Sequence, residues 1–305
     1  MDLAAFASEV GSSGPVAIVG GRTAWEVGGA PADDTRLVTA PVGVVEHEAS
    51  EMTVRVGAGT TVAELDDFLS PSGQCVALPS APGATVGGTL AVGRSGTRRL
   101  GWGPVRDVVL EIRYVSAEGV LVTAGGPMIK NVSGFDLCRL LVGSLGTLGL
   151  IGEVVLRTRP VPEAEAWLTG PADPDAALAE LATAATVFWD GARTWVRLSG
   201  LGVDVTAETE RAAAVGLVPG ADPPEPPQGG RWSLPPAELE ALPRRHPGLR
   251  FLAEMGVGVV HADAAAPPRP VSTEIATLHR RIKSEFDPER RLNPGRDPLA
   301  SMGAH

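Results

Sequence analysis

Glycine-rich segments between residues 79 and 158 constrain the possible folds of this chain more than any other feature. Two of them set glycines among small residues, at Gly83, Gly87, Gly88, Gly143, Gly146 and Gly149. Glycine has no Cβ, so its backbone can adopt positive φ and can approach a bound group closely. Two such loops in one region predict a single extended ligand that is held largely by main-chain atoms.

Regular elements are expected around these loops. Apolar and β-branched runs predict strands over Val108–Tyr114 and Val120–Ala124. A short helix over Phe135–Val142 is expected to lead into the second loop. Nearer the N-terminus, Thr61 and Glu64 form the pattern of a capping box, which predicts the start of a helix.

Another glycine segment, the first in chain order, follows the first apolar strand, residues 16–19. It reads Gly20-Gly21-Arg22-Thr23. A plain β-turn would fit these four residues, because short glycine motifs also occur by chance. Their position ahead of the two other loops favours a turn whose N–H groups face an anion.

Three motifs stand in a fixed order in the N-terminal half: GATVGG at residues 83–88, PVRDVVLEIRYVSAEGVL at 104–121 and KNVSGFDLCRLLVGSLGTLG at 130–149. This series resembles the FAD domain of the vanillyl-alcohol-oxidase/PCMH flavoprotein family. Within the family it is most similar to the FAD-binding subunits of glycolate oxidases, beside the D-lactate dehydrogenases. The resemblance extends to a short tail at 286–296 and is thin between about 163 and 270.

The resemblance implies an α+β fold, with a two-lobed PCMH-type FAD-binding domain and a small, ferredoxin-like cap. We expect the FAD-binding domain at 1–160 and the cap at 161–285, with a proline-rich loop at 219–236. The tail, 286–305, is expected to return to the FAD domain. An alternating strand and helix pattern after residue 163 also favours a ferredoxin-like cap.

The resemblance also implies which residues contact FAD. They are Gly20, Gly21, Arg22, Thr23, Gly83, Ala84, Thr85, Gly87, Gly88, Asn131, Asp136, Gly143, Ser144, Gly146, Thr147, Gly149, Ile151 and Asn293. Asp136 fits a helix cap equally well, since aspartate is a preferred N-cap residue. Many relatives bond the flavin to a histidine, but residues 19–29 contain none, so we expect non-covalent FAD.

Oxidation of a 2-hydroxy acid, such as glycolate or lactate, is the reaction that the resemblance implies. It needs a base for the hydroxyl proton, a cation for the carboxylate and a hydride acceptor. His261 is the candidate base, although an ordinary histidine at a strand end fits as well. Arg280 is the candidate cation on the last helix, with Arg197 and Arg250 as alternatives.

Composition excludes several other classes of protein. The net charge is −10 without a basic stripe, which disfavours nucleic acid as a partner. No apolar run approaches the roughly 18 residues of a membrane span, and the N-terminus lacks the features of a signal peptide, so we expect a cytoplasmic protein. Residues 88–95 come close to a phosphate-binding P-loop, but Arg94 stands in place of its lysine.

The leading functional hypothesis is an FAD-binding subunit of a glycolate oxidase-like 2-hydroxy-acid dehydrogenase complex. Two cysteines cannot ligate an iron–sulfur cluster, which takes about four. Onward electron transfer would therefore need an iron–sulfur subunit or a soluble acceptor, and a larger flavin subunit could take the hydride. Such partners could also hold the chain at the inner membrane. Alternatives are a stand-alone FAD-dependent oxidase or dehydrogenase and a structural subunit whose FAD does not turn over.

Overall fold

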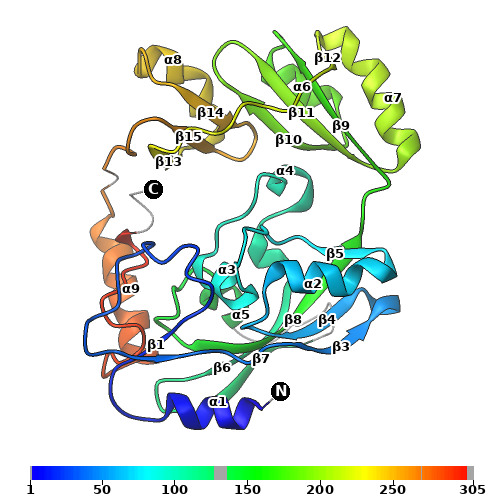
Figure 1. The fold of residues 1–305 in the computed structure, drawn as a ribbon. Helices are drawn as coiled ribbons and strands as arrows, with labels where there is room; N and C mark the ends of the chain where they lie inside the picture. The colour runs from blue at the N-terminus through cyan, green and yellow to red at the C-terminus, as the bar shows by residue number, and fades with distance from the viewer. Residues whose placement is uncertain (1, 127–135, 269, 301–305) are drawn as a thin grey trace. The chain divides into compact units, whose positions relative to one another are not determined.

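The computed structural model describes residues 2–126, 136–268 and 270–300. These residues form two compact units (Figure 1). Unit 1 takes in the described parts of Met1–Gly96, Pro104–Val161 and Val271–Ser301. Unit 2 takes in Thr97–Gly103 and the described part of Pro162–Pro270. The mixture of helices and antiparallel sheets in both units confirms the predicted α+β class.

Unit 1 is built on a six-stranded antiparallel sheet. Its strands are β3 (Val44–Glu48), β4 (Thr53–Gly57), β5 (Gln74–Val76), β6 (Val109–Val115), β7 (Leu121–Gly125) and β8 (Leu150–Pro160). The order is β3-β4-β8-β6-β7, and β5 pairs with the far end of β8. The first seven residues of β8 are all buried, which fits a central strand rich in apolar residues.

Short helices pack on this sheet. They are α1 (Leu3–Val10), α2 (Val62–Leu69), α3 (Val86–Val92), α5 (Leu137–Leu141) and α9 (Thr273–Phe286). The predicted capping box is present: the Thr61 hydroxyl accepts from the Glu64 N–H, and the Glu64 carboxylate accepts from the Thr61 N–H. Leu65 and Leu69 of α2 and Leu90 of α3 are fully buried in the same apolar core as β8.

A small parallel sheet carries the first glycine segment. Strand β1 (Val16–Ile18) pairs with β2 (Arg36–Val38), and Gly20 follows β1 closely. On its other side β1 meets the C-terminal tail, because Leu292 bridges to Val16 and the Asn293 N–H donates to the Val16 carbonyl at 2.8 Å. Residues that are almost 280 positions apart in the sequence are thereby joined beside one loop.

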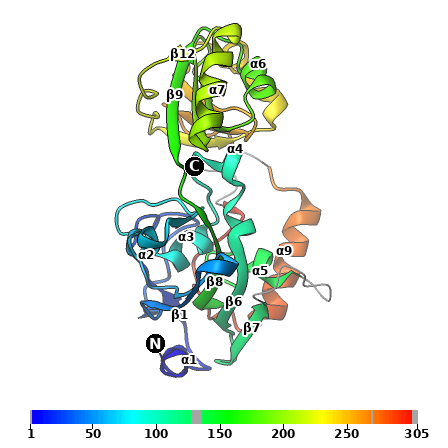
Figure 2. The same cartoon turned by 90° about the vertical axis from the view of Figure 1, so that its right-hand side faces the viewer.

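Unit 2 contains a β-α-β-β-α-β arrangement. In chain order it comprises β9 (Ala164–Gly170), α6 (Pro174–Glu180), β10 (Ala184–Trp189), β11 (Thr194–Gly200), α7 (Gly202–Ala212) and β12 (Val218–Pro219). The strand order β12-β9-β11-β10 is the fourth-first-third-second order of the ferredoxin-like motif that the sequence predicted. Figure 2 shows α6 and α7 on one side of these strands.

Three further strands extend this sheet beyond β10 to seven strands. They are β14 (Phe251–Glu254), β15 (Val259–Ala262) and β13 (Gly230–Ser233), in that spatial order. Unit 2 also contains the short helices α4 (Arg99–Trp102) and α8 (Leu242–Arg245). Leu168, Leu198 and Leu242 are buried in its apolar core.

The two units differ in two places from the domain boundaries expected from sequence. Helix α9 was expected in the cap, but it lies in unit 1, where Ile282 and Phe286 pack against the core. Residues 97–103 were expected in the FAD domain, but they lie in unit 2, where the Thr186 hydroxyl donates to the Thr97 carbonyl at 2.9 Å. Tertiary packing decides both placements, and the local sequence carries no sign of it.

Candidate cofactor site

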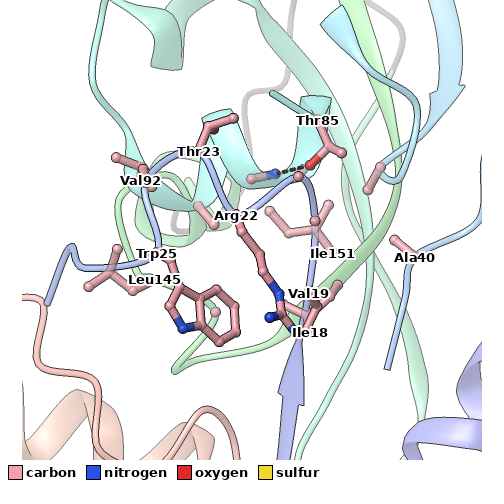
Figure 3. A pocket seen from close by; sticks show the side chains of 18 of the residues that line it. Ile18, Val19, Arg22, Thr23, Trp25, Ala40, Thr85, Val92, Leu145 and Ile151 are labelled. Carbon is pink, nitrogen blue, oxygen red and sulfur yellow. Dashed lines mark hydrogen bonds between the residues drawn. The ribbon is translucent and has the colours of Figure 1, made fainter. Parts of the chain in front are cut away.

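A pocket opens in unit 1 where the glycine segments meet (Figure 3). The empty space that its walls enclose, together with the open solvent at its mouth, is about 760 Å³. It is lined by Ile18, Val19, Gly20, Gly21, Arg22, Thr23, Ala24, Trp25, Ala40, Ala58, Gly59, Thr85, Gly87, Gly88, Ala91, Val92, Leu145, Gly146, Ile151, Asn293 and Arg296.

The segment 20–23 has backbone donors that are not used by the protein. Among the described residues, none of its four N–H groups donates to a protein acceptor, and all four residues are exposed. Val19, just before it, donates to the Val38 carbonyl of β2. Arg22 has φ 55°, a left-handed conformation that is uncommon outside glycine. Successive free N–H groups around such a residue form a concavity that suits an anion.

The other two glycine loops use most of their N–H groups internally. Gly87 donates to the Ala58 carbonyl, and Gly88 donates to the Thr85 hydroxyl at 3.2 Å, the dashed bond in Figure 3. In the loop 143–149, Gly143 donates to the Leu90 carbonyl and Leu145 donates to the Ala91 carbonyl. Most of the N–H groups of these two loops are therefore engaged within the protein.

Several glycines are required because protein atoms lie where a side chain would begin. A Cβ on Gly21 would lie 1.7 Å from the Gly83 carbonyl oxygen, and one on Gly20 would lie 2.3 Å from the Thr85 hydroxyl oxygen. Contacts this close do not occur between real atoms, so the first loop can lie against the second only without side chains there. Gly83 itself faces the first loop and does not line the pocket.

The tail enters the pocket at Asn293, which is only 1% exposed. Its side-chain oxygen accepts from the Ile18 N–H at 3.2 Å. A Cβ on Gly146 would lie 2.2 Å from its Nδ2 atom, so the amide fits into the space left by that glycine. Among the described residues this Nδ2 has no hydrogen-bond partner, although buried amides nearly always have one.

Two arginines flank one tryptophan at the pocket. The guanidinium of Arg22 lies 5.0 Å from the centre of the Trp25 ring, and that of Arg296 lies 4.6 Å from it. Figure 3 shows the Arg22 and Trp25 side chains next to one another. Arg296 also donates to the Val27 carbonyl at 2.8 Å, and burial lowers its pKa. A partly desolvated cation of this kind favours a nearby anion.

In unit 2 a second group of polar side chains lies on β13, β14 and β15. His261 Nε2 is 2.9 Å from a carboxylate oxygen of Glu254, which is 4% exposed. Arg231 lies directly opposite His261 in the register of β13 and β15. Burial lowers the pKa of Arg231, although the charge of Glu254 opposes this shift. The Arg231 guanidinium makes no hydrogen bond within the described part of the chain.

Ten of the residues expected at the cofactor line the pocket: Gly20, Gly21, Arg22, Thr23, Thr85, Gly87, Gly88, Gly146, Ile151 and Asn293. Six do not line it but support its loops or helices: Gly83, Ala84, Gly143, Ser144, Thr147 and Gly149. Thr147, for example, donates its hydroxyl to the Ser144 carbonyl, and Gly149 packs against the Tyr114 ring.

The remaining predicted residues lie elsewhere. Asp136 caps α5, where its carboxylate accepts from the Arg139 N–H at 3.1 Å and pairs with the Arg139 guanidinium. It does not line the pocket, so the capping alternative describes its contacts. Asn131 lies outside the described residues. Arg280 is exposed on α9 and bonds to Ala276 and Thr277 of its own helix.

Sequence reasoning missed most of the pocket's apolar lining. Val19, Ala58, Leu145 and other small or apolar residues look like ordinary core positions, because nothing local separates a cavity wall from a packed interior. Arg296 and Trp25 carried a weak signal. Each lies a few residues from a motif that was recognised, Asn293-Pro294-Gly295 and Gly20-Gly21, and a basic or aromatic neighbour of such a motif is worth testing.

Comparison with known proteins agrees with this geometry. Residues 2–125 match the family model described as an FAD binding domain. The N-terminal part of this chain is therefore similar to the FAD-binding domain family. Glycolate oxidase subunit GlcE of Escherichia coli is 32% identical over 199 residues, which cover 61% of this chain and 56% of that protein. D-lactate dehydrogenase of Archaeoglobus fulgidus is 38% identical over 159 residues, covering 51% and 35%.

The chain thus spans about half the length of these relatives, or less. Among solved structures, alkyldihydroxyacetonephosphate synthase matches with a TM-score of 0.66 at 17% identity, covering 92% of this chain and 71% of that one. This likeness shows a shared fold. The FAD-binding family match ends at residue 125, whereas the pocket also takes residues from 145 to 151 and from the tail.

Metal-binding clusters and membrane-spanning helices are both absent from the described residues. No group of three or more His, Cys, Asp or Glu side chains there could hold a metal ion. None of the helices that the structure describes combines the length and apolar character needed to cross a membrane.

Proposed function

We propose that this chain binds FAD in the pocket of unit 1 and serves in the oxidation of a 2-hydroxy acid. The observation that carries the proposal is the segment 20–23, with four free backbone N–H groups at a pocket in an FAD-binding domain. Its N–H groups suit the diphosphate of FAD. Arg22 and Arg296 would add positive charge beside it.

The residues of the pocket fit FAD in two further respects. The unpartnered Nδ2 of Asn293 is a buried donor that an oxygen or nitrogen acceptor of the cofactor would satisfy. The apolar lining by residues such as Val19, Leu145 and Ile151 suits the ring systems. We propose that FAD is held without a covalent bond, since no histidine is among the described residues that line the pocket.

FAD, when bound, supplies the hydride acceptor. We propose His261 as the base for the substrate hydroxyl. In the tautomer whose Nε2–H donates a hydrogen bond to the Glu254 carboxylate, Nδ1 carries no proton. Nδ1 is then the atom that accepts the hydroxyl proton. Glu254 would hold this tautomer and stabilise the imidazolium that forms. We propose Arg231 for the substrate carboxylate in place of Arg280, because its guanidinium is partly desolvated and makes no hydrogen bond within the described residues.

Glycolate and D-lactate are the substrates we propose, from the names of the relatives. The relatives named as glycolate oxidase subunits support work within a complex. We propose an iron–sulfur subunit and a larger flavin subunit as partners, and the cytoplasm as the location.

The test is anaerobic mixing of the FAD-loaded chain with glycolate or D-lactate while the flavin absorbance is followed. Bleaching by the chain alone is expected if it performs the oxidation, and it should fall by about 10²–10⁴-fold in rate in His261→Asn. Bleaching that requires added partners would assign the hydride step to them and leave this chain an FAD-holding role. Bleaching that is unchanged in His261→Asn would remove the base assignment.

A further inference from the structure

An ion pair between a half-buried lysine and a buried aspartate lies at the end of α9, outside the pocket. Lys283 Nζ donates to an Asp287 carboxylate oxygen at 2.5 Å, to the Thr147 carbonyl at 2.7 Å and to the Leu292 carbonyl at 3.3 Å. All three donors of the ammonium are therefore used. Asp287 is fully buried and also accepts from the backbone N–H groups of Arg291 and Leu292, at 3.0 and 2.8 Å.

This pair joins two segments that the sequence keeps far apart. Thr147 belongs to the glycine loop 143–149, which is the third in chain order after 20–23 and 83–88. Leu292 belongs to the tail. The buried carboxylate favours this geometry, because loss of Lys283 would leave the buried charge of Asp287 uncompensated. The position of the tail against the loop therefore depends on Lys283 and Asp287.

The tail enters the pocket directly after this fixed point. Leu292 bridges to Val16 of β1, and Asn293 adopts φ 44° with its side-chain oxygen on the Ile18 N–H. A left-handed asparagine persists only where its surroundings hold it. The result is that the unpartnered Nδ2 lies at Gly146, at the wall of the pocket.

The tail then reaches the first glycine loop. Arg296 stacks on Trp25, and the Asp297 N–H donates to the Gly28 carbonyl at 2.7 Å. At one end, segment 291–297 is linked to the loop 143–149 through Lys283, which donates to both Leu292 and Thr147. At the other end it contacts Trp25 and Gly28, just after the glycine segment 20–23. Trp25 and residues of the loop 143–149 line the pocket.

We propose that Lys283 and Asp287 are positioning residues for the cofactor: they fix segment 291–297 as a latch that holds the first and third loops around FAD. Neither side chain lines the pocket, so their effect on FAD would pass through Asn293 and Arg296. This inference rests on the proposed function. By linkage, FAD binding must then stabilise the latch as much as the latch stabilises FAD binding.

The first experiment compares Asp287→Asn with Glu285→Gln. The control removes one carboxylate charge from an exposed residue of the same helix. Flavin fluorescence gives the FAD dissociation constant, and visible circular dichroism reports the asymmetry of the flavin's surroundings. We expect Asp287→Asn to raise the dissociation constant at least tenfold and to change the flavin dichroism, with Glu285→Gln like the wild type. A folded Asp287→Asn with wild-type affinity and dichroism would overturn the latch.

A second measurement on the wild-type chain covers the case in which Asp287→Asn does not fold. Hydrogen exchange is followed with and without FAD in peptides from 286–297 and, for reference, from α2. Addition of FAD should slow exchange more in the tail peptide than in α2. Equal slowing in both would reject the latch while leaving FAD binding intact, whereas a wild type that binds no FAD at all would reject the proposed function itself.

Discussion

At the scale of single residues, the pocket depends on glycines, whose lack of a side chain leaves space for neighbouring atoms. Gly146 shows this most clearly, since the Asn293 amide takes the space of its missing side chain. Sequence alone could place glycines near a ligand, because they cluster in recognisable motifs. It could not say that Gly21 faces Gly83 and that Gly146 faces Asn293, because these pairings exist only after distant loops have packed together.

Gly146→Ala should therefore weaken both FAD binding and the fold. The new Cβ would lie 2.2 Å from Asn293 Nδ2, and the residue has φ 70°, so both the tail and the loop must shift. We expect at least a tenfold rise in the FAD dissociation constant and a loss of about 1–3 kcal/mol of unfolding free energy. Titration with FAD and urea unfolding measure the two effects.

Gly126→Ala is the matched control for this substitution. Among the described residues, a Cβ added at Gly126 would have no heavy atom within 4 Å, and the residue has no positive φ. Its FAD affinity should equal that of the wild type. Equal affinities for Gly146→Ala and Gly126→Ala would mean that the contact between Gly146 and Asn293 does not matter for the cofactor.

At the scale of elements, the start of α2 was predictable, because the capping box of Thr61 and Glu64 depends only on residues close in sequence. The helix expected over Phe135–Val142 is observed over Leu137–Leu141, with Asp136 as its N-cap. Which strands pair with one another in the sheets was not predictable. The pairing of β10 with β14 joins strands more than 60 residues apart, across the proline-rich loop.

In unit 2, Glu165 of β9 ties together three segments and should make this unit sensitive to acid. Burial raises its pKa, but hydrogen bonds from Arg197 and Ser199 and the charges of Arg98 and Arg197 outweigh burial, so the net pKa is lowered. A carboxylate with a lowered folded pKa stabilises the fold above its unfolded pKa of about 4.5 and loses this contribution as the pH falls through the folded value.

Glu165→Gln should therefore destabilise unit 2 at pH 7 and have progressively less effect below a pH of about 4.5. Urea unfolding, followed by tryptophan fluorescence at pH 7 and at a pH below about 4.5, measures the difference in unfolding free energy from the wild type. Glu163→Gln, an exposed neighbour that accepts only from the Gly202 N–H among the described residues, is the comparison. A difference that is constant across this pH range would show that the charge of Glu165 contributes nothing.

At the scale of the whole molecule, the FAD-binding family could be recognised from sequence because its motifs are contiguous and ordered. The same reasoning gives a prediction for the purified protein. Flavin should be released by heat or acid and should be absent from the protein band on a denaturing gel, because the described lining of the pocket contains no histidine. Fluorescence that stays with the denatured chain would instead demonstrate a covalent bond.

The cap was harder to predict than the FAD domain. Its βαββαβ order follows from the alternation of strands and helices, but Arg231, Glu254 and His261 come from three strands that pair only in the folded sheet. His261 was a candidate from sequence, but Glu254, seven residues away, and Arg231 showed no local pattern that would group them with it. The group of three side chains therefore emerged only from strand register.

The return of residues 271–300 to unit 1 has a practical consequence for anyone who divides the gene. A fragment stopped at residue 161 would contain every glycine motif and yet lack Asn293 and Arg296. A peptide of residues 271–300, added separately, should bind to this fragment and complete the pocket.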